Sequence, residues 1–152
     1  MLRQRLYLFV LLIPLFTCCK KHTSRIYTSD CANNIQLKKI SYRNLMDSLQ
    51  FYQNRYVQVS GEYRQGKELS ALVSDSSSFS SDTGRSLWVN FVPDCPLFEK
   101  HTHVGLFQST DGEYLNFDKT RMAIGGRLEL QKTKARGVYR PTLNNVCYVE
   151  LK

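Results

Sequence analysis

The sequence predicts a mainly β domain, a small five-stranded Greek-key barrel that follows one amphipathic helix. Five stretches alternate apolar and polar residues with a period of two, as strands with one buried face require. A glycine lies inside the first and the fourth of these stretches, where a strand must coil sharply for a barrel to close. The connection between the third and the fourth stretch is longer than the others, which is typical of a small closed barrel.

The first 17 residues predict a lipoprotein signal peptide. Arg3 and Arg5 form a positive start, Leu6–Phe16 is a short apolar run, and a cysteine pair follows. The run is shorter than the roughly 20 apolar residues that a membrane-spanning helix needs. Residues 15–18, Leu-Phe-Thr-Cys, resemble the bacterial lipoprotein pattern, which implies that Cys18 receives the lipid, with Cys19 as the alternative. An uncleaved signal anchor and a buried helix are the other interpretations.

We expect residues 18–38 to be a flexible tether and residues 39–152 to be the barrel domain, since the tether begins with polar residues and is rich in them. The anchor makes the membrane a partner and places the protein in the bacterial cell envelope, at the outer membrane.

The predicted helix covers Ser41–Asn54. Leu45, Leu49 and Tyr52 recur at helical spacing, and Ser41 is suited to cap the first turn.

The first strand is the clearest in the chain. Val57, Val59, Gly61 and Tyr63 alternate with polar residues from Tyr56 onward. A short turn at 65–67 leads to a second strand, which has its apolar residues on one side: Leu69, Ala71 and Val73. The two stretches predict a hairpin.

A polar loop is expected over 74–85, followed by a third strand over Ser86–Val92. In that strand Leu87, Val89 and Phe91 face inward, Trp88 faces outward, and two prolines end the pairing. Residues 97–118 show no steady period, so they predict a loop with one helical turn at most.

The fourth strand is expected over Thr120–Leu130, with Gly125 and Gly126 allowing a bulge. The fifth covers Leu143–Leu151 and places Cys147, Val149 and Leu151 on one face. Five strands with this spacing are typical of a barrel of the oligonucleotide/oligosaccharide-binding (OB) type.

Four segments of the chain resemble uncharacterised bacterial secreted and lipoprotein domains with an OB-like barrel. The segments are Val57 to Tyr63 (V-x-V-x-G-x-Y), Glu68 to Leu72 (E-x-S-x-L), Trp88-Val89, and Gly137 to Tyr139 (G-x-Y). The resemblance covers about residues 40–152 and implies a fold without an activity. Such domains often carry a Gly-His pair where this chain has Ala135-Arg136, so no role of that histidine is transferred.

The formal net charge of +8 is concentrated in clusters. Trp88 and a late basic cluster form the possible ligand patch: Lys132, Lys134, Arg136 and Arg140. On an exported protein, anionic lipid or polysaccharide suits such a cluster better than nucleic acid, which is an unlikely partner. The alternative is a solvated basic face without a ligand. Trp88 with Tyr63 and Tyr139 is a second candidate, as a stacking surface for sugars or bases, unless Tyr63 is in the core.

Three cysteines remain beyond the signal, which is an odd number for an oxidising compartment. The simplest arrangement pairs Cys31 with Cys95 and leaves Cys147 as a buried thiol; three free thiols are the alternative.

No catalytic residue, metal site or cofactor is predicted. His101 and His103 lack a spaced third ligand beyond Cys95 or Asp94, and Glu62 and Glu68 stand without a supporting motif. We therefore expect a non-enzymatic envelope protein that binds a protein or a glycan. An accessory of an envelope complex without its own ligand is the alternative, and an enzyme comes third.

Overall fold

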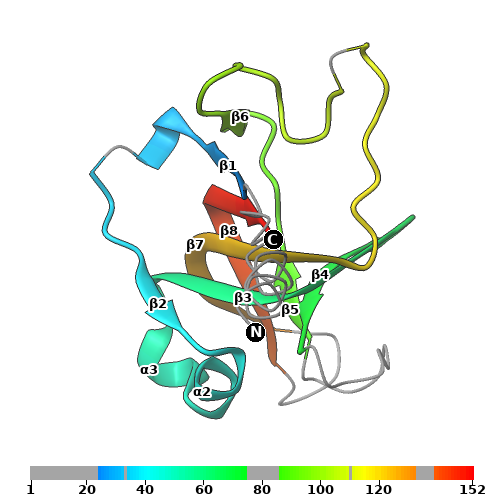
Figure 1. Ribbon diagram of the computed structural model, residues 1–152. Coiled ribbons are helices and arrows are strands. Elements are labelled where there is room, and N and C mark those ends of the chain that lie inside the picture. The colour runs from blue at the N-terminus through cyan, green and yellow to red at the C-terminus, as the bar shows by residue number, and fades with distance from the viewer. Residues whose placement is uncertain (1–23, 33, 75–85, 110, 133–138) are drawn as a thin grey trace, which may run out of the picture.

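The computed structural model describes residues 24–32, 34–74, 86–109, 111–132 and 139–152, and the structural statements below concern these residues (Figure 1). The described part is mainly β. Its strands are β1 (Arg25–Thr28), β2 (Lys38–Ile40), β3 (Tyr56–Gly66), β4 (Leu69–Val73), β5 (Leu87–Val89), β6 (Phe98–Glu99), β7 (Thr120–Lys132) and β8 (Tyr139–Leu151). Its helical elements are the 3₁₀ turn η2 (Asp30–Ala32) and the short helices α2 (Tyr42–Asp47) and α3 (Leu49–Tyr52).

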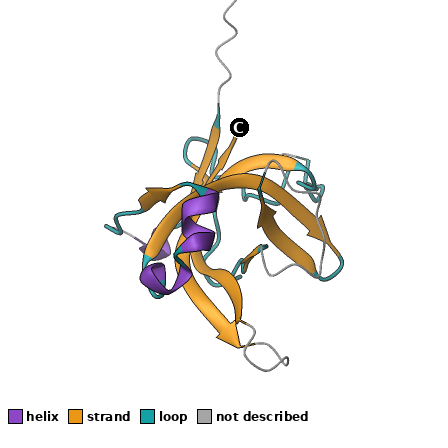
Figure 2. Ribbon diagram, turned by 90° about the horizontal axis from the view of Figure 1, so that it is seen from below, coloured by secondary structure: helices purple, strands orange, loops and turns teal. Residues whose placement is uncertain are grey.

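Five strands close into a barrel in the order β3, β4, β5, β8, β7 and back to β3. Within the barrel, neighbouring strands are antiparallel except β5 and β8, which run parallel through Trp88 opposite Thr142 and Val89 opposite Leu143. Figure 2 shows the strands curving around the interior, with both helices beside them. The mainly β fold and the barrel predicted from the sequence are therefore confirmed.

Glycines in β3 and β7 allow the strands to approach closely. A Cβ on Gly61 would lie 2.6 Å from the carbonyl oxygen of Val73 in β4. A Cβ on Gly126 would lie 2.9 Å from the carbonyl oxygen of Asn144, and the β7–β8 register shifts between Gly125 and Arg127. The expected bulge is thus present. Glycine suits these positions because the neighbouring backbone comes too close there to leave room for a side chain.

The barrel interior is filled by the inward residues of the strands. Tyr63 in β3 is 2% exposed, lies opposite Leu72, and has its hydroxyl oxygen 2.9 Å from Ser70 Oγ. Since Ser70 and Leu72 share the inner face with Tyr63, the other residues of β4 lie on the outer face: Leu69, Ala71 and Val73. The apolar side that the sequence identifies in β4 is therefore the outer one, and Ala71 and Val73 are nevertheless buried there.

The expected helix over Ser41–Asn54 consists of two short helices. Ser41 caps α2 as predicted, since its hydroxyl accepts from the Asn44 backbone N–H. The chain leaves the helical conformation at Ser48, where φ is −136°, and α3 then adds four residues. Ser48 N–H bonds to the Leu45 carbonyl and so ends α2, which periodicity alone does not reveal.

Tyr42 attaches α2 to the barrel. Its hydroxyl donates to the Leu72 carbonyl oxygen at 3.0 Å and accepts from the Leu87 backbone N–H at 3.2 Å, so one side chain joins the helix to β4 and β5. Burial raises the pKa of Tyr42 to about 12, although the hydrogen bond from Leu87 opposes the shift.

The segment expected as a flexible tether, residues 18–38, contains regular structure from Arg25 onward. β1 pairs with β8 and β6, and β2, which begins at Lys38, pairs in parallel with β3. The sequence misses β1 because four residues are too few to establish a period of two. Residues 1–17, which are predicted to be a signal peptide, and residues 18–23 lie outside the described residues. No helix in the described ranges has the length and apolar character needed to cross a membrane.

Candidate binding site

An apolar pocket of about 410 Å³ is formed by the connection between β5 and β7. Two segments of that connection, residues 91–98 and 105–108, make its walls. They are held together by backbone hydrogen bonds from Leu106 to Leu97 (2.9 Å) and from Glu99 to Val104 (2.9 Å). Most of the lining residues are apolar: Phe91, Val92, Pro93, Pro96, Leu97, Phe98, Leu106 and Phe107. The pocket therefore suits an apolar group.

A row of aromatic rings runs from the barrel interior past this pocket to the surface. Buried Tyr63 makes an edge contact with Phe91, whose ring lies 5.1 Å from that of Phe107. Phe107 then stacks on Tyr114 with an interplanar angle of 4° and 5.6 Å between the centroids. Tyr114 is 69% exposed, and Phe98 at the pocket is 38% exposed. Two large rings thus face solvent at or near an apolar pocket.

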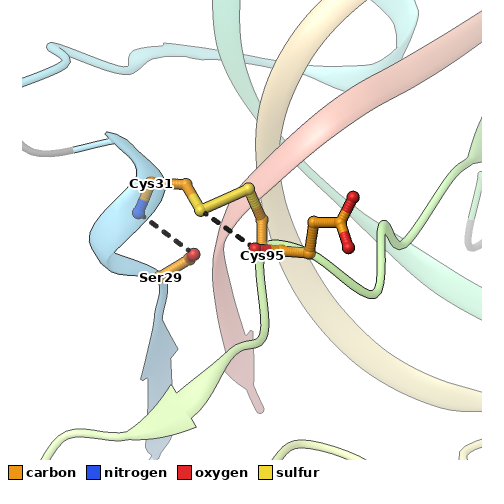
Figure 3. The surroundings of a disulfide bond; sticks show 4 residues. Ser29, Cys31 and Cys95 are labelled. Carbon is orange, nitrogen blue, oxygen red and sulfur yellow. Dashed lines mark hydrogen bonds between the residues drawn. A yellow bond between two sulfur atoms is a disulfide. The ribbon is translucent and has the colours of Figure 1, made fainter.

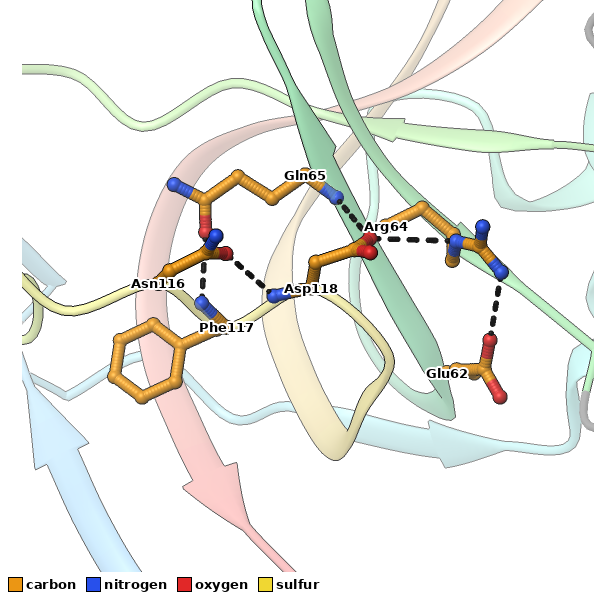
Figure 4. A network of polar contacts seen from close by, with 6 residues as sticks. All are labelled: Glu62, Arg64, Gln65, Asn116, Phe117 and Asp118. Atoms are coloured by element: carbon orange, nitrogen blue, oxygen red, sulfur yellow. Dashed lines mark hydrogen bonds and ion pairs between the residues drawn. The ribbon is translucent and has the colours of Figure 1, made fainter.

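Polar contacts fix the connection to β3 (Figure 4). Gln65 holds it at three atoms: its backbone N–H donates to Asp118 Oδ1, its Oε1 accepts from the Phe117 N–H, and its Nε2 donates to the Tyr114 hydroxyl. Arg64 lies between two carboxylates, 3.1 Å from Glu62 Oε1 and 3.4 Å from Asp118 Oδ1. The aromatic row is therefore anchored on a barrel strand.

A disulfide joins Cys31 of η2 to Cys95 in the pocket wall, with the two Cα atoms 5.7 Å apart (Figure 3). This is the pair that the sequence analysis favours, and it ties the segment after β1 to the connection that forms the pocket. Cys147 is a free, buried thiol that lines a separate pocket with both bonded cysteines. Because burial raises the pKa of the Cys147 thiol, it stays protonated and is a poor nucleophile.

Two residues of the predicted ligand patch, Trp88 and Arg140, lie in contact in the structure. The Arg140 guanidinium lies 4.5 Å from the centroid of the Trp88 ring, so these two residues stack on the outer face of the barrel. Lys132 is exposed near the end of β7. Lys134 and Arg136 lie outside the described residues, as does the side chain of Tyr139. Tyr63 is inside the barrel, so it does not share a stacking surface with Trp88.

The histidines and glutamates that the sequence offers as candidates, although none of them is predicted to form a site, do not converge. His101 and His103 are exposed in a turn, and the described residues contain no group of three or more metal-ligating side chains. Glu62 lies opposite Val73, whereas Glu68 lies in the turn after Gly66, so these carboxylates are not cross-strand partners. The proposed lipid acceptors, Cys18 and Cys19, lie outside the described residues.

The aromatic row is the feature that sequence reasoning missed. Two of its members, Phe107 and Tyr114, come from residues 97–118, which show no steady period, and they meet Phe91 and Tyr63 only after that loop folds back onto β3. The density of aromatic residues in that loop is the one signal that pointed to it.

Comparisons of this chain with protein-family models, with curated proteins and with solved structures give no match.

Proposed function

We propose that this protein is a non-enzymatic, lipid-anchored binding protein of the bacterial cell envelope, and that it binds an apolar side chain of a protein partner. The observation that carries the proposal is the apolar pocket of about 410 Å³ with exposed Phe98 at its wall. Exposed apolar patches and apolar pockets mark sites at which proteins bind partners or ligands. The fixed position of the loop supports this, because an ordered site loses less entropy on binding.

We also propose that the barrel is OB-like with Greek-key connections. The strand order β3, β4, β5, β8, β7, the parallel β5–β8 pair and the long β5–β7 connection support this assignment. A fold of this type hosts many functions, so the ligand is argued from the pocket.

A glycan is the second candidate ligand. Tyr114 supports it, since its ring is 69% exposed and already stacked on Phe107, which leaves its other face free to pack on a sugar ring. An accessory role without a ligand is the remaining alternative.

Titration followed by nuclear magnetic resonance tests the ligand class. We expect N-acetyl-phenylalanine amide and N-acetyl-leucine amide to shift the amide signals of Leu97, Gly105 and Leu106. N-acetylglucosamine oligomers should not shift them. Phe98→Asp places a charge at the pocket and should abolish the shifts, whereas Phe51→Asp, at another exposed phenylalanine, should leave them unchanged.

The titration has two outcomes against the proposal. Shifts caused by the sugars at residues around Tyr114, with none from the amides, favour the glycan. Absence of shifts with every probe contradicts a ligand pocket and favours the accessory role.

The lipid anchor rests on the sequence of residues 1–19 and needs its own test. We expect intact-mass analysis of protein extracted from outer membranes to show an acylated amino terminus at Cys18 or Cys19. Cys18→Ser and Cys19→Ser, made separately, identify the acceptor by loss of that mass. Membrane-bound protein with an unmodified amino terminus contradicts the anchor.

A further inference from the structure

A second pocket, of about 270 Å³, lies on the outer surface of the barrel beside β2 and the end of β8. It shares no residue with the apolar pocket and is polar in character. Two lysines, Lys39 and Lys152, and two serines, Ser41 and Ser60, are among the residues that line it. The Ser41 hydroxyl also accepts from the Asn44 backbone N–H as the cap of α2. Lys152 Nζ donates to Ser60 Oγ at 2.9 Å. The full lining is Lys39, Ile40, Ser41, Gln58, Ser60, Glu150 and Lys152.

Further basic residues surround the end of β8. Arg25 pairs with Leu151, the Lys152 backbone N–H donates to the Arg121 carbonyl at 3.0 Å, and the Lys100 N–H donates to the Ile26 carbonyl at 3.2 Å. Figure 2 shows β1 beside the chain end marked C. The side chains of these four basic residues, and that of Lys39, are exposed. We call this set the basic end of the barrel: Arg25, Lys39, Lys100, Arg121 and Lys152.

The acidic residues nearby are fewer than the basic ones. Glu150 in the pocket accepts a hydrogen bond from the Tyr148 hydroxyl at 3.2 Å. Glu62, which lies opposite Arg121, is bound by Arg64, and Glu99 accepts from the Thr102 hydroxyl. The Tyr148 and Thr102 hydroxyls are neutral, so Glu150 and Glu99 keep their negative charges. Five basic residues against these three carboxylates still leave the basic end with an excess of positive charge, which attracts anions.

The distance along the chain places this end close to the proposed anchor. Arg25, the first residue of β1, is seven positions after Cys18. Seven fully extended residues span at most about 25 Å. An acyl chain on Cys18 or Cys19 would therefore keep Arg25 within about that distance of the bilayer surface, which allows the basic end to reach the headgroups.

We propose that the basic end is a membrane-docking surface and that the polar pocket binds the phosphate-bearing headgroup of an anionic phospholipid. Two lysines and two serines in the lining suit a phosphate and outnumber the single carboxylate there, that of Glu150, and the surrounding arginine and lysine residues suit a negatively charged leaflet. This inference rests on the lipid anchor of the proposed function, and it fixes which end of the barrel faces the bilayer.

Lysine footprinting on the full chain tests the docking. The protein is reconstituted into vesicles of phosphatidylcholine alone or of phosphatidylcholine with phosphatidylglycerol, treated with an amine-reactive reagent, and mapped by mass spectrometry. Labelling of Lys39 and Lys152 should fall about threefold in the anionic vesicles and recover at high salt, since exposed charge contacts are screened. Lys67, at the β3–β4 turn seven residues beyond Ser60, is the control and should label equally in both.

A third sample contains phosphatidylcholine vesicles with added inorganic phosphate, and it should leave Lys39 and Lys152 labelled. Protection there assigns the pocket to a free anion and overturns the docking surface. Equal labelling in both vesicle types, or protection that includes Lys67, also overturns it. Failure of the protein to associate with either kind of vesicle contradicts the anchor itself, which separates the two proposals.

Discussion

Gly61 lies so close to Val73 that a Cβ on residue 61 would be 2.6 Å from the Val73 carbonyl oxygen. The contact is between backbones, so a flexible side chain cannot move aside to relieve it. It lies on β3, the strand that pairs with both β4 and β7 and so helps to close the barrel.

Gly61→Ala should therefore destabilise the protein by about 2–4 kcal/mol, because the added methyl group forces β3 and β4 apart. Urea unfolding measures the loss. Gly66→Ala is the matched control on the same strand, since its Cβ would lie 3.4 Å from Leu69 Cβ and should cost much less. Equal losses for the two variants would show that the close approach at Gly61 does not matter.

Tyr42→Phe removes the hydroxyl that joins α2 to β4 and β5. We expect a loss of about 1–3 kcal/mol, since the Leu72 carbonyl and the Leu87 N–H each lose a partner. Tyr52→Phe is the control, because Tyr52 is a half-buried tyrosine of α3 whose hydroxyl has no hydrogen bond to a described residue. This variant should change the unfolding free energy little. A loss no larger than that of the control argues against the bridge.

The raised pKa of Tyr42 predicts a loss of stability at high pH. The folded state holds this proton up to a pH of about 12, whereas the unfolded chain releases it near 10.0. The contribution of this proton to the free energy of unfolding is therefore fully present below pH 10 and is lost as the pH rises toward 12. Burial raises the pKa of Tyr63 and Tyr148 in the same direction, so the wild-type protein should lose stability steadily in this range. Tyr42→Phe should show a shallower decline, and an identical slope would contradict the shift.

Replacing both Cys31 and Cys95 with serine should cost about 4 kcal/mol, because the disulfide closes a loop with a sequence separation of 64. Denaturant unfolding measures the loss, and Cys147→Ser separates it from the general effect of changing a cysteine. Non-reducing peptide mapping should recover the peptides that contain residues 31 and 95 as one linked species. Their recovery as separate free thiols would support the alternative of three unpaired cysteines.

The elements that follow a local period could be predicted from the sequence. Long alternating runs predict β3 and β7, because one face of each strand is buried. The adjacent glycines predict the bulge at Gly125 and Gly126. β1 and β6 have four and two residues, which is too short for a period, and their pairing depends on distant partners. The face of β4 was not evident either, because Ala71 and Val73 are buried on the outside of the barrel.

The candidate site could be predicted less well than the fold. Its rings come from one loop, but their contacts depend on Gln65 and Asp118, which join β3 to that loop across 53 residues. A contact between residues so far apart in the chain cannot be predicted from the spacing of residues within either segment. The stacking of Arg140 on Trp88 is a similar case, because the parallel β5–β8 pair brings together residues from the third and the fifth barrel strand.

Trp88 is the only tryptophan in the chain, so its fluorescence reports directly on the stack with Arg140. Arg140→Gln removes the guanidinium from the half-buried indole, and we expect a red-shifted emission and faster quenching by acrylamide. The melting temperature should change little, since a single exposed cation–π pair contributes about 0.5–1 kcal/mol. Arg43→Gln, at an arginine whose side chain is 92% exposed in α2, is the control and should leave the emission unchanged. If Arg140→Gln alters neither the emission nor the quenching, Arg140 does not cover the Trp88 ring, and the stack is refuted.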